Sequence, residues 1–346
     1  MNIKIKVVSL LLAVIMVAGV FGGCSKIGGV NTDDYSKVVV ATYGDKNIYL
    51  DEVNFFARNS QYVYESYYGT DIWSNEQYSG IGDYLMQSIV SSLYQTEVLV
   101  DKAAELGITL SDEDKEKAAA AVEEFFSESD EKLIEACDVT KERLTEIFEK
   151  NALANRVYES TYIDKDCSVT DEEAAQSTVD YILVPASEGE DKAKEVLEAV
   201  SGGKDIKEAA EEYGFSTSTI SFGSGDYDNE IGTVSKEMSE GEYAIANVES
   251  DGWYVMYMKD KFDESATENK KKTLENNKKV DFFKEVYAQW VEEGPKFKVD
   301  ESILSLISFT KSIYEAPETT EAEDSSDSAQ TTEAETASDS AENTEE

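Results

Sequence analysis

The pattern of hydrophobic residues changes twice along the chain, and this constrains the fold more than any other feature. Residues 51–162 carry apolar side chains at helical spacing with short interruptions. Between about 170 and 262, strand-like runs alternate with two short helical stretches, and residues 268–293 return to one long helical pattern. A helical domain whose last helix follows an inserted module is one folding unit made of two chain segments. The sequence therefore predicts an α+β protein, with a mostly helical domain built from two segments and a small α/β domain inserted into it.

The elements predicted before the insertion are a hairpin and a series of helices. The hairpin comprises residues 38–43 and 48–50, and Asp51 is expected to cap the helix that follows it. On that helix, apolar side chains recur at roughly helical spacing at Val53, Phe56, Tyr62 and Val63. After a loop at 69–82, further helices are predicted at residues 84–106, 111–126, 130–137 and 140–162.

The insertion is predicted to contain a sheet and two helices. Its elements are a strand at 179–184, helices at 192–200 and 206–213, and short strands and turns over 219–258. The run "DGWYVMYMKDK" at 251–261 is typical of the edge of a buried sheet. Alternation places Val255 and Tyr257 on one face of this strand, and the other face carries Tyr254, Met256 and Met258. After the long helix, residues 296–299 are expected to form a closing strand.

The first residues have the pattern of a secretory signal. Lys4 and Lys6 precede an apolar run at 7–20, which is too short for a comfortable membrane span, and Gly22-Gly23-Cys24 follows. This junction resembles the lipobox of bacterial lipoproteins. By that resemblance, Cys24 would become the lipid-modified first residue of the mature protein. A plain secretory signal with a chance cysteine is the alternative.

Charge and composition exclude several classes of function. The net charge is −42; removing the eleven acids of residues 317–346 and the two signal lysines leaves −33. Such a body repels nucleic acids and anionic lipid headgroups. The chain has no histidine, which removes the usual general base and metal ligand. Cys137 and Cys167 can pair or remain free thiols.

The sequence predicts a division of the chain into six parts. The last part, the acidic end, lacks residues that bury surface and is expected to be disordered. These parts are a signal peptide (1–23), a tether (24–37), an N-terminal helical domain (38–168), the α/β insertion (169–262), a C-terminal helix and strand completing the helical domain (263–314) and an acidic tail (315–346).

Several motifs resemble the PrsA-type foldase lipoproteins and the related SurA-like periplasmic chaperones. They are "VVVATYGDKNIYLDEVNFF", "ELGITLSDEDKEKA" and "FFKEVYAQWVEEGPKFKVD", and the likeness covers about 38–300. The insertion resembles a parvulin-type peptidyl-prolyl isomerase domain. The motifs that carry this resemblance are "VDYILVP", "AKEVLEAVSGGKDIKEAAEEY", "FGSGDYDNEIGTVSKEMSEGEYA" and "DGWYVMYM".

The parvulin resemblance implies a degenerate isomerase site. The family's two facing histidines correspond here to Tyr181 and Tyr254, and its proline socket corresponds to Tyr227, Ile231 and Lys236. A tyrosine cannot imitate a linked imidazole pair, and a lysine in the socket would have to reach solvent or lose its charge. No cofactor or metal is expected. The run "DYDNEIG" begins like a calcium loop but has Ile231 where such a loop needs glycine.

Aromatic residues are unusually dense near residue 70, and they suggest a groove for unfolded polypeptide. They are Tyr62, Tyr64, Tyr67, Tyr68, Trp73 and Tyr78. The leading hypothesis is a lipid-anchored extracytoplasmic foldase or chaperone for newly secreted polypeptides, with an isomerase domain of weak or absent activity. An active isomerase of the same architecture is the alternative, a solute-binding lipoprotein is a third reading, and a homodimer remains open.

Overall fold

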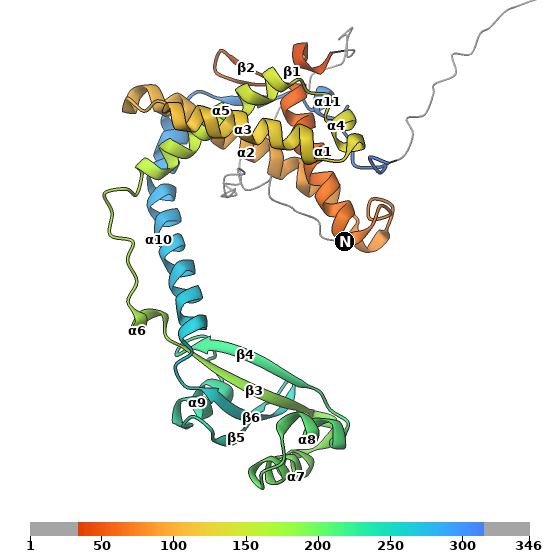
Figure 1. The fold of residues 1–346 in the computed structure, drawn as a ribbon, viewed down its shortest axis with the longest axis vertical. Coiled ribbons are helices and arrows are strands. Elements are labelled where there is room, and N and C mark those ends of the chain that lie inside the picture. Colours follow the sequence, from red (N-terminus) through yellow and green to blue (C-terminus); the bar gives the residue numbers. More distant parts are fainter. Residues whose placement is uncertain (1–33, 315–346) are drawn as a thin grey trace, which may run out of the picture.

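In a computed structural model of this protein, the structure describes residues 34–314 (Figure 1). The predicted signal peptide, Cys24, most of the predicted tether and the predicted acidic tail lie outside the described residues. Within 34–314, no helix has both the length and the apolar character needed to span a membrane. The α+β class expected from the sequence is confirmed.

The first body of structure, here called the helical body, is formed by the two ends of the described chain. Its first segment contains two short 3-10 turns, a hairpin and five helices: η1 (Tyr35–Lys37), β1 (Val39–Tyr43), β2 (Lys46–Tyr49), α1 (Leu50–Tyr68), η2 (Glu76–Tyr78), α2 (Ile81–Leu106), α3 (Asp112–Glu128), α4 (Glu131–Cys137) and α5 (Lys141–Ser160). Its second segment contains the end of α10 (Glu264–Glu293), then β7 (Phe297–Val299) and α11 (Glu301–Leu304).

A three-stranded antiparallel sheet joins the two segments. The strand order is β2-β1-β7, and Tyr43 of β1 lies opposite Phe297 of β7. The closing strand that follows the insertion thus pairs with the first strand of the chain. Apolar side chains from β1, α1, α2 and residues 303–309 form one core under this sheet.

The start of α1 differs from the prediction. The helix begins at Leu50 with Tyr49 at its N-cap position, so Asp51 is not the cap. Asp51 instead lies inside the first turn and is 2% exposed. Of the apolar residues on this helix, Phe55 is the deeply buried aromatic, packed edge-on against Phe125 and Phe148, whereas Phe56 is half-buried.

The second body, the sheet body, is the inserted part of the chain. After the short helix α6 (Asp171–Ala174) it contains β3 (Gln176–Pro185), η3 (Ala186–Glu188), α7 (Glu190–Ser201), α8 (Ile206–Tyr213), β4 (Thr217–Gly223), α9 (Glu230–Glu237), β5 (Tyr243–Val248) and β6 (Gly252–Asp260). The antiparallel sheet has the order β4-β3-β6-β5.

Strand β6 therefore lies inside the sheet and not at its edge, which corrects the prediction for 251–261. The predicted faces are confirmed. Val255 and Tyr257 pack towards α7 and α8, and the opposite face carries Tyr254, Met256 and Met258, which pack with Ile231 of α9. Helices cover both faces, which explains why this strand is apolar on both. Helix α9 also corrects the sequence reading, which expected only strands and turns over 219–258.

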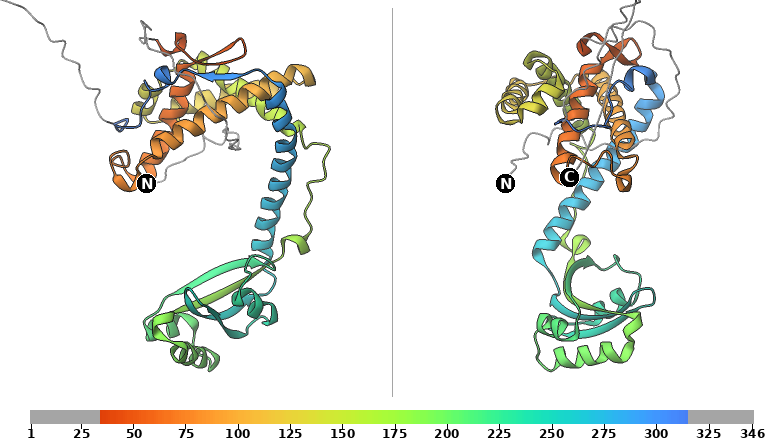
Figure 2. Two further views of the ribbon diagram at one scale, coloured as in Figure 1. Left: turned by 180° about the vertical axis from the view of Figure 1, so that it is seen from behind. Right: turned by 90° about the vertical axis from the view of Figure 1, so that its right-hand side faces the viewer.

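Helix α10 connects the two bodies (Figures 1 and 2). At its start, the Asp263 amide donates to the Gln176 carbonyl at 2.8 Å, and Thr267 Oγ1 accepts from the Gln176 amide at 3.0 Å. Near its end, Phe283 and Tyr287 are buried against α2 and α5. Each end of this 30-residue helix is thus fixed to a different body.

Candidate functional site

The two residues at the family's histidine positions face each other in the sheet body. Tyr181 lies on β3 and Tyr254 on the neighbouring β6, with ring centroids 5.1 Å apart and ring planes inclined by 45°. Both rings are half-buried and pack on the apolar cluster of the α9 side. Strand alternation puts both side chains on this face.

The hydroxyl of Tyr254 is held by a nearby carboxylate. It donates to Asp251 Oδ2 at 2.8 Å, in the turn between β5 and β6. Burial, and after it the hydrogen bond to Asp251, raises the pKa of Tyr254 to about 12. Tyr254 therefore remains a neutral hydrogen-bond donor at physiological pH, and it does not act as a general base there.

Two of the three predicted socket residues lie beside this pair. Tyr227 packs edge-on against Phe222 at 5.4 Å between ring centroids, and Ile231 of α9 is 3% exposed. Both belong to the apolar cluster that contacts Tyr181 and Tyr254.

Lys236 does not join the other predicted socket residues. It is exposed on α9, and the buried apolar contact next to it in sequence comes from Met238, which is 4% exposed. Because an unpaired ammonium group is costly to bury, the lysine faces solvent. Reaching solvent is one of the two outcomes expected from the sequence for a lysine at a socket position, and the role of Lys236 in a proline socket stays a prediction. What the arrangement offers chemically is an apolar surface that also carries the phenol groups of Tyr181, Tyr227 and Tyr254, the last of which donates a hydrogen bond to Asp251.

The acidic residues of "DYDNEIG" have structural roles. Asp226 Oδ2 accepts from the Gly223 amide at 2.8 Å, and Glu230 Oε2 accepts from the Asn247 amide at 2.9 Å. Within residues 34–314, no three acidic or cysteine side chains come together as potential metal ligands.

A second candidate site lies in the helical body, where α1 ends and the loop 69–80 begins. Tyr64 lies 5.9 Å from Tyr68 and 6.4 Å from Trp73, and Tyr68 lies 5.7 Å from Tyr78, measured between ring centroids. Tyr67 and Tyr68 are 69% and 55% exposed. We call Tyr64, Tyr67, Tyr68, Trp73 and Tyr78 the aromatic patch. Exposed aromatic surface of this kind marks binding sites for apolar partners.

The sixth residue of the predicted aromatic group lies elsewhere. Tyr62 packs on the core formed by Phe55 with α3 and α5. The sequence thus showed that aromatic residues are frequent in this segment, but it did not show which of them share a surface.

The comparison with known families bears on this helical body. The family of SurA-like N-terminal domains matches residues 1–163. This match covers 163 of the 346 residues, and it shows what the first part of the chain is similar to. The resemblance expected from the sequence is thereby confirmed for the part of the chain that bears the aromatic patch. The parvulin-like identity of residues 169–262 stays a prediction.

Solved structures that are similar to part of the chain include several PrsA proteins. The chain is 16% identical to the peptidylprolyl isomerase PrsA from Bacillus anthracis, with 59% of this chain and 96% of that one covered and a TM-score of 0.31. For PrsA from Bacillus cereus the identity is 19%, the coverage 67% and 90%, and the TM-score 0.33. For the foldase protein PrsA from Lactococcus lactis the values are 15%, 79% and 99%, and 0.31. The likeness is distant on both measures. No curated protein matches the chain.

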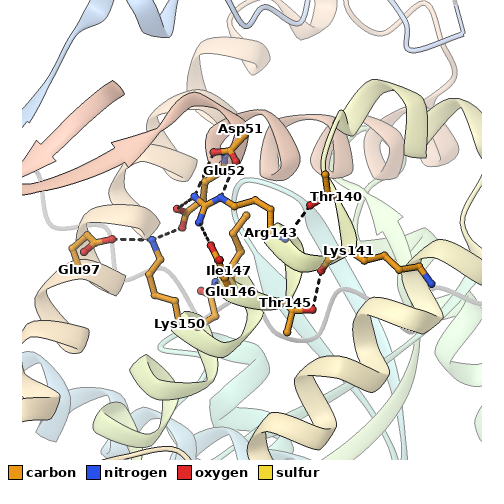
Figure 3. Close-up of polar contacts among 11 residues, drawn as sticks. Asp51, Glu52, Glu97, Thr140, Lys141, Arg143, Thr145, Glu146, Ile147 and Lys150 are labelled. Carbon is orange, nitrogen blue, oxygen red and sulfur yellow. Dashed lines mark hydrogen bonds and ion pairs between the residues drawn. The ribbon is translucent and has the colours of Figure 1, made fainter. Parts of the chain in front are cut away.

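The helical body also contains buried charges that the sequence pattern did not predict (Figure 3). Glu52, next to Asp51 in the first turn of α1, is 1% exposed. Arg143 Nε of α5 contacts Asp51 Oδ2 at 2.8 Å. Lys150 Nζ, also of α5, contacts Glu52 Oε1 at 2.6 Å and Glu97 Oε1 of α2 at 2.8 Å. This charge network ties α1, α2 and α5 together.

The pKa directions in the charge network follow from burial and pairing. Burial raises the pKa of Glu52, and Lys150 opposes this rise. Burial also lowers the pKa of Lys150, but the two carboxylates Glu52 and Glu97 outweigh it, so the net direction is upward. A pattern of apolar spacing cannot reveal such a network, because the partners come from three helices.

The two described cysteines are free. Cys137 is buried, and burial raises the pKa of its thiol to about 12. Because the thiolate is the reactive form, Cys137 is chemically inert at neutral pH.

Proposed function

We propose that the protein is an extracytoplasmic foldase or chaperone that binds unfolded segments of newly secreted polypeptides. The aromatic patch on the helical body is the observation that carries this proposal. Four of its five rings, those of Tyr64, Tyr68, Trp73 and Tyr78, lie in one continuous series of contacts. Tyr67 and Tyr68 are each more than half exposed. Aromatic faces make apolar contacts without requiring a particular client sequence.

The proposed chaperone role is tested by suppression of aggregation of a chemically unfolded client. We expect the double variant Tyr67→Ser and Tyr68→Ser to lose most of the suppression, because it removes the two most exposed rings of the aromatic patch. Ile163→Ser is the matched control, since Ile163 is 73% exposed and lies outside the aromatic patch. Wild-type protein that fails to suppress aggregation at equimolar concentration would contradict the proposal.

We further propose that a lipid on Cys24 holds the protein at the outer side of the cytoplasmic membrane. The support is the positive start, the apolar run and the Gly-Gly-Cys junction of the sequence. Cys24→Ala is expected to abolish incorporation of radiolabelled fatty acid into the protein. Normal incorporation in this variant would refute lipidation at this position.

The sheet body is proposed to be a parvulin-like domain with weak or absent isomerase activity. The support is the replacement of both family histidines by Tyr181 and Tyr254 and the exposure of Lys236. We expect Tyr181→Phe with Tyr254→Phe to change prolyl-peptide isomerisation little.

An active isomerase is the second candidate function. It is favoured by one observation, which is that Tyr181 and Tyr254 face each other beside an apolar cluster. A wild-type acceleration of several hundredfold that Tyr254→Phe abolishes would establish this candidate and refute the inactive site.

A further inference from the structure

The described chain ends in a segment that lies across α1, which we call the strap (residues 307–314). It is the dark blue stretch after α11 in Figure 1. The strap belongs to no helix or strand. Three of its residues are nevertheless buried. Ile307, Phe309 and Ser312 are 4%, 7% and 6% exposed. An irregular segment with buried side chains needs partners for its main chain.

Those partners are side chains on one face of α1. Arg58 Nη1 donates to the Ser308 carbonyl at 3.0 Å, and Gln61 Nε2 donates to the Lys311 carbonyl at 2.5 Å. The Ile313 amide donates to Glu65 Oε1 at 3.4 Å. One further contact uses a strap side chain, because Ser312 Oγ donates to Glu65 Oε2 at 2.9 Å. The main-chain contacts do not depend on the sequence of the segment that is bound.

The polar face of α1 is braced independently of the strap. Arg58 Nη1 donates to Gln61 Oε1 at 2.7 Å, and Gln61 Nε2 donates to Glu65 Oε1 at 3.0 Å. Trp73 Nε1, from the aromatic patch, donates to the same Glu65 oxygen at 2.6 Å. Gln61 and Glu65 are 0% and 5% exposed. With the strap in place both side chains are shielded from water, so the strap itself has to supply the hydrogen bonds that the braces leave unmade, because an unsatisfied buried polar group is costly.

The strap places an aromatic anchor against the aromatic patch. The Phe309 ring stacks on Trp73 at 5.2 Å between centroids. On its other side, Gly82 of α2 leaves room for the ring, because a Cβ there would lie 3.0 Å from Phe309 Cβ. The strap therefore joins the same surface that we propose for clients.

Open space adjoins the strap on two sides. A hollow of about 770 Å³ lies between the strap, α1 and α4, and Arg58 and Lys132 are among its lining residues. A second hollow of about 460 Å³ lies between the strap and the start of α2, and Tyr78 and Met86 are among its lining residues. The two hollows leave room for the side chains that flank the aromatic residue of a bound segment.

We propose that this face of α1 is a groove that binds an extended polypeptide through its main chain and one aromatic side chain, and that the strap is its resident occupant. The occupant it fits is a client segment with an aromatic residue between small polar ones, as in the strap sequence "ISFTKSIY". The strap thus competes with clients for the groove. This inference deepens the proposed chaperone function and rests on it.

The experiment measures binding of a fluorescein-labelled peptide, SLISFTKSIY, to the full chain by fluorescence anisotropy. Phe309→Ala removes the anchor of the resident strap, so we expect this variant to bind the peptide at least about tenfold more tightly than wild type. Leu306→Ala is the matched control, because Leu306 is 37% exposed just before the strap. Adding Gln61→Ala to Phe309→Ala is expected to abolish the gain, and so is replacing the peptide's phenylalanine with alanine.

Equal peptide affinity in wild type and in a folded Phe309→Ala variant would overturn the proposal. So would a Phe309→Ala protein that dimerises without binding the peptide, because the groove would then belong to a second copy. If Phe309→Ala does not fold, Phe309→Leu replaces it, with an expected gain of about threefold. The peptide-binding experiment contains no aggregating client. A negative result there would therefore refute the groove, whereas the proposed chaperone function is tested separately by the aggregation assay with wild type.

Discussion

At the scale of single residues, the polar side chains of α1 form two sets with different partners. Asp51 and Glu52, in the first turn, pair with cations of α5. Arg58, Gln61 and Glu65, further along, contact the main chain or side chains of the strap. The first set fixes the helix in the core, and the second set presents a binding face. A charged residue buried in a pair becomes expensive when its partner is removed.

We expect Lys150→Met to destabilise the protein by about 3 kcal/mol or more, because Glu52 and Glu97 would lose their shared cation. The measurement is the free energy of unfolding from urea titration. Lys117→Met is the control, since the Lys117–Glu113 pair is exposed at 71% and 72% and its loss should cost less than about 1 kcal/mol. Equal losses in the two variants would show that the charge network does not stabilise the fold.

The raised pKa of Glu52 gives a pH dependence with a definite sign. The folded state binds this proton more tightly than the unfolded state, whose value is near 4.5. Protonation of Glu52 therefore makes its whole contribution to the free energy of unfolding below the unfolded-state pKa. This contribution is lost as the pH rises through the folded-state pKa. The stability of wild type relative to Glu52→Gln should increase between pH 7 and pH 5. Urea midpoints at the two pH values measure this, and a decreasing difference would contradict it.

At the scale of elements, sequence patterns predicted what is local and missed what depends on distant partners. The faces of β6 followed from alternation within nine residues. Its place inside the sheet did not, because β6 pairs on one side with β5, the strand just before it, and on the other side with β3, which lies far earlier in the sequence. Helix α9 was missed because a glycine and β-branched residues interrupt its short helical pattern.

The candidate sites show the same division. The resemblance predicted Tyr181, Tyr254, Tyr227 and Ile231, which the fold brings into one cluster. Lys236 is exposed, and its direction depends on which face of α9 meets the sheet, which the resemblance alone does not give. The strap gave no signal, because its contacts are with side chains about 250 residues earlier in the chain.

The first residue of β6 is a glycine that allows this strand to approach the end of β3 closely. Gly252 has φ of +131°, and a Cβ there would lie 2.3 Å from the Val184 carbonyl oxygen and 2.6 Å from the Ala186 amide nitrogen. Gly241 also has positive φ, at +83°, but lies in open space. We expect Gly241→Ala to cost about 1 kcal/mol and Gly252→Ala at least about twice as much, measured by urea unfolding. Similar costs would mean that the strand approach at Gly252 relaxes freely.

At the scale of the whole molecule, α10 keeps the two bodies apart while each end is fixed to one of them (Figure 2). The connection before the insertion runs beside α10 and is attached to it. Lys271 contacts Asp171 at 2.8 Å, and Lys278 Nζ donates to the Ser168 carbonyl at 2.6 Å. The two chain ends of the sheet body meet at the start of α10, where the Gln176 carbonyl accepts from the Asp263 amide. The insertion can therefore be removed at one point without stretching the rest of the chain.

We expect replacement of residues 176–262 by a short Gly-Ser linker to leave the helical body folded and to retain much of the aggregation suppression. The reason is that the cores around Phe283 and Tyr287, around β1 and around α1 use no side chain of the sheet body. The measurements are circular dichroism for helix content and the same client aggregation assay used for the full chain. As a control, the Tyr67→Ser and Tyr68→Ser pair should abolish suppression in the shortened protein as well. A folded but inactive shortened protein would instead place client binding on the sheet body, and the aromatic patch would lose its proposed role.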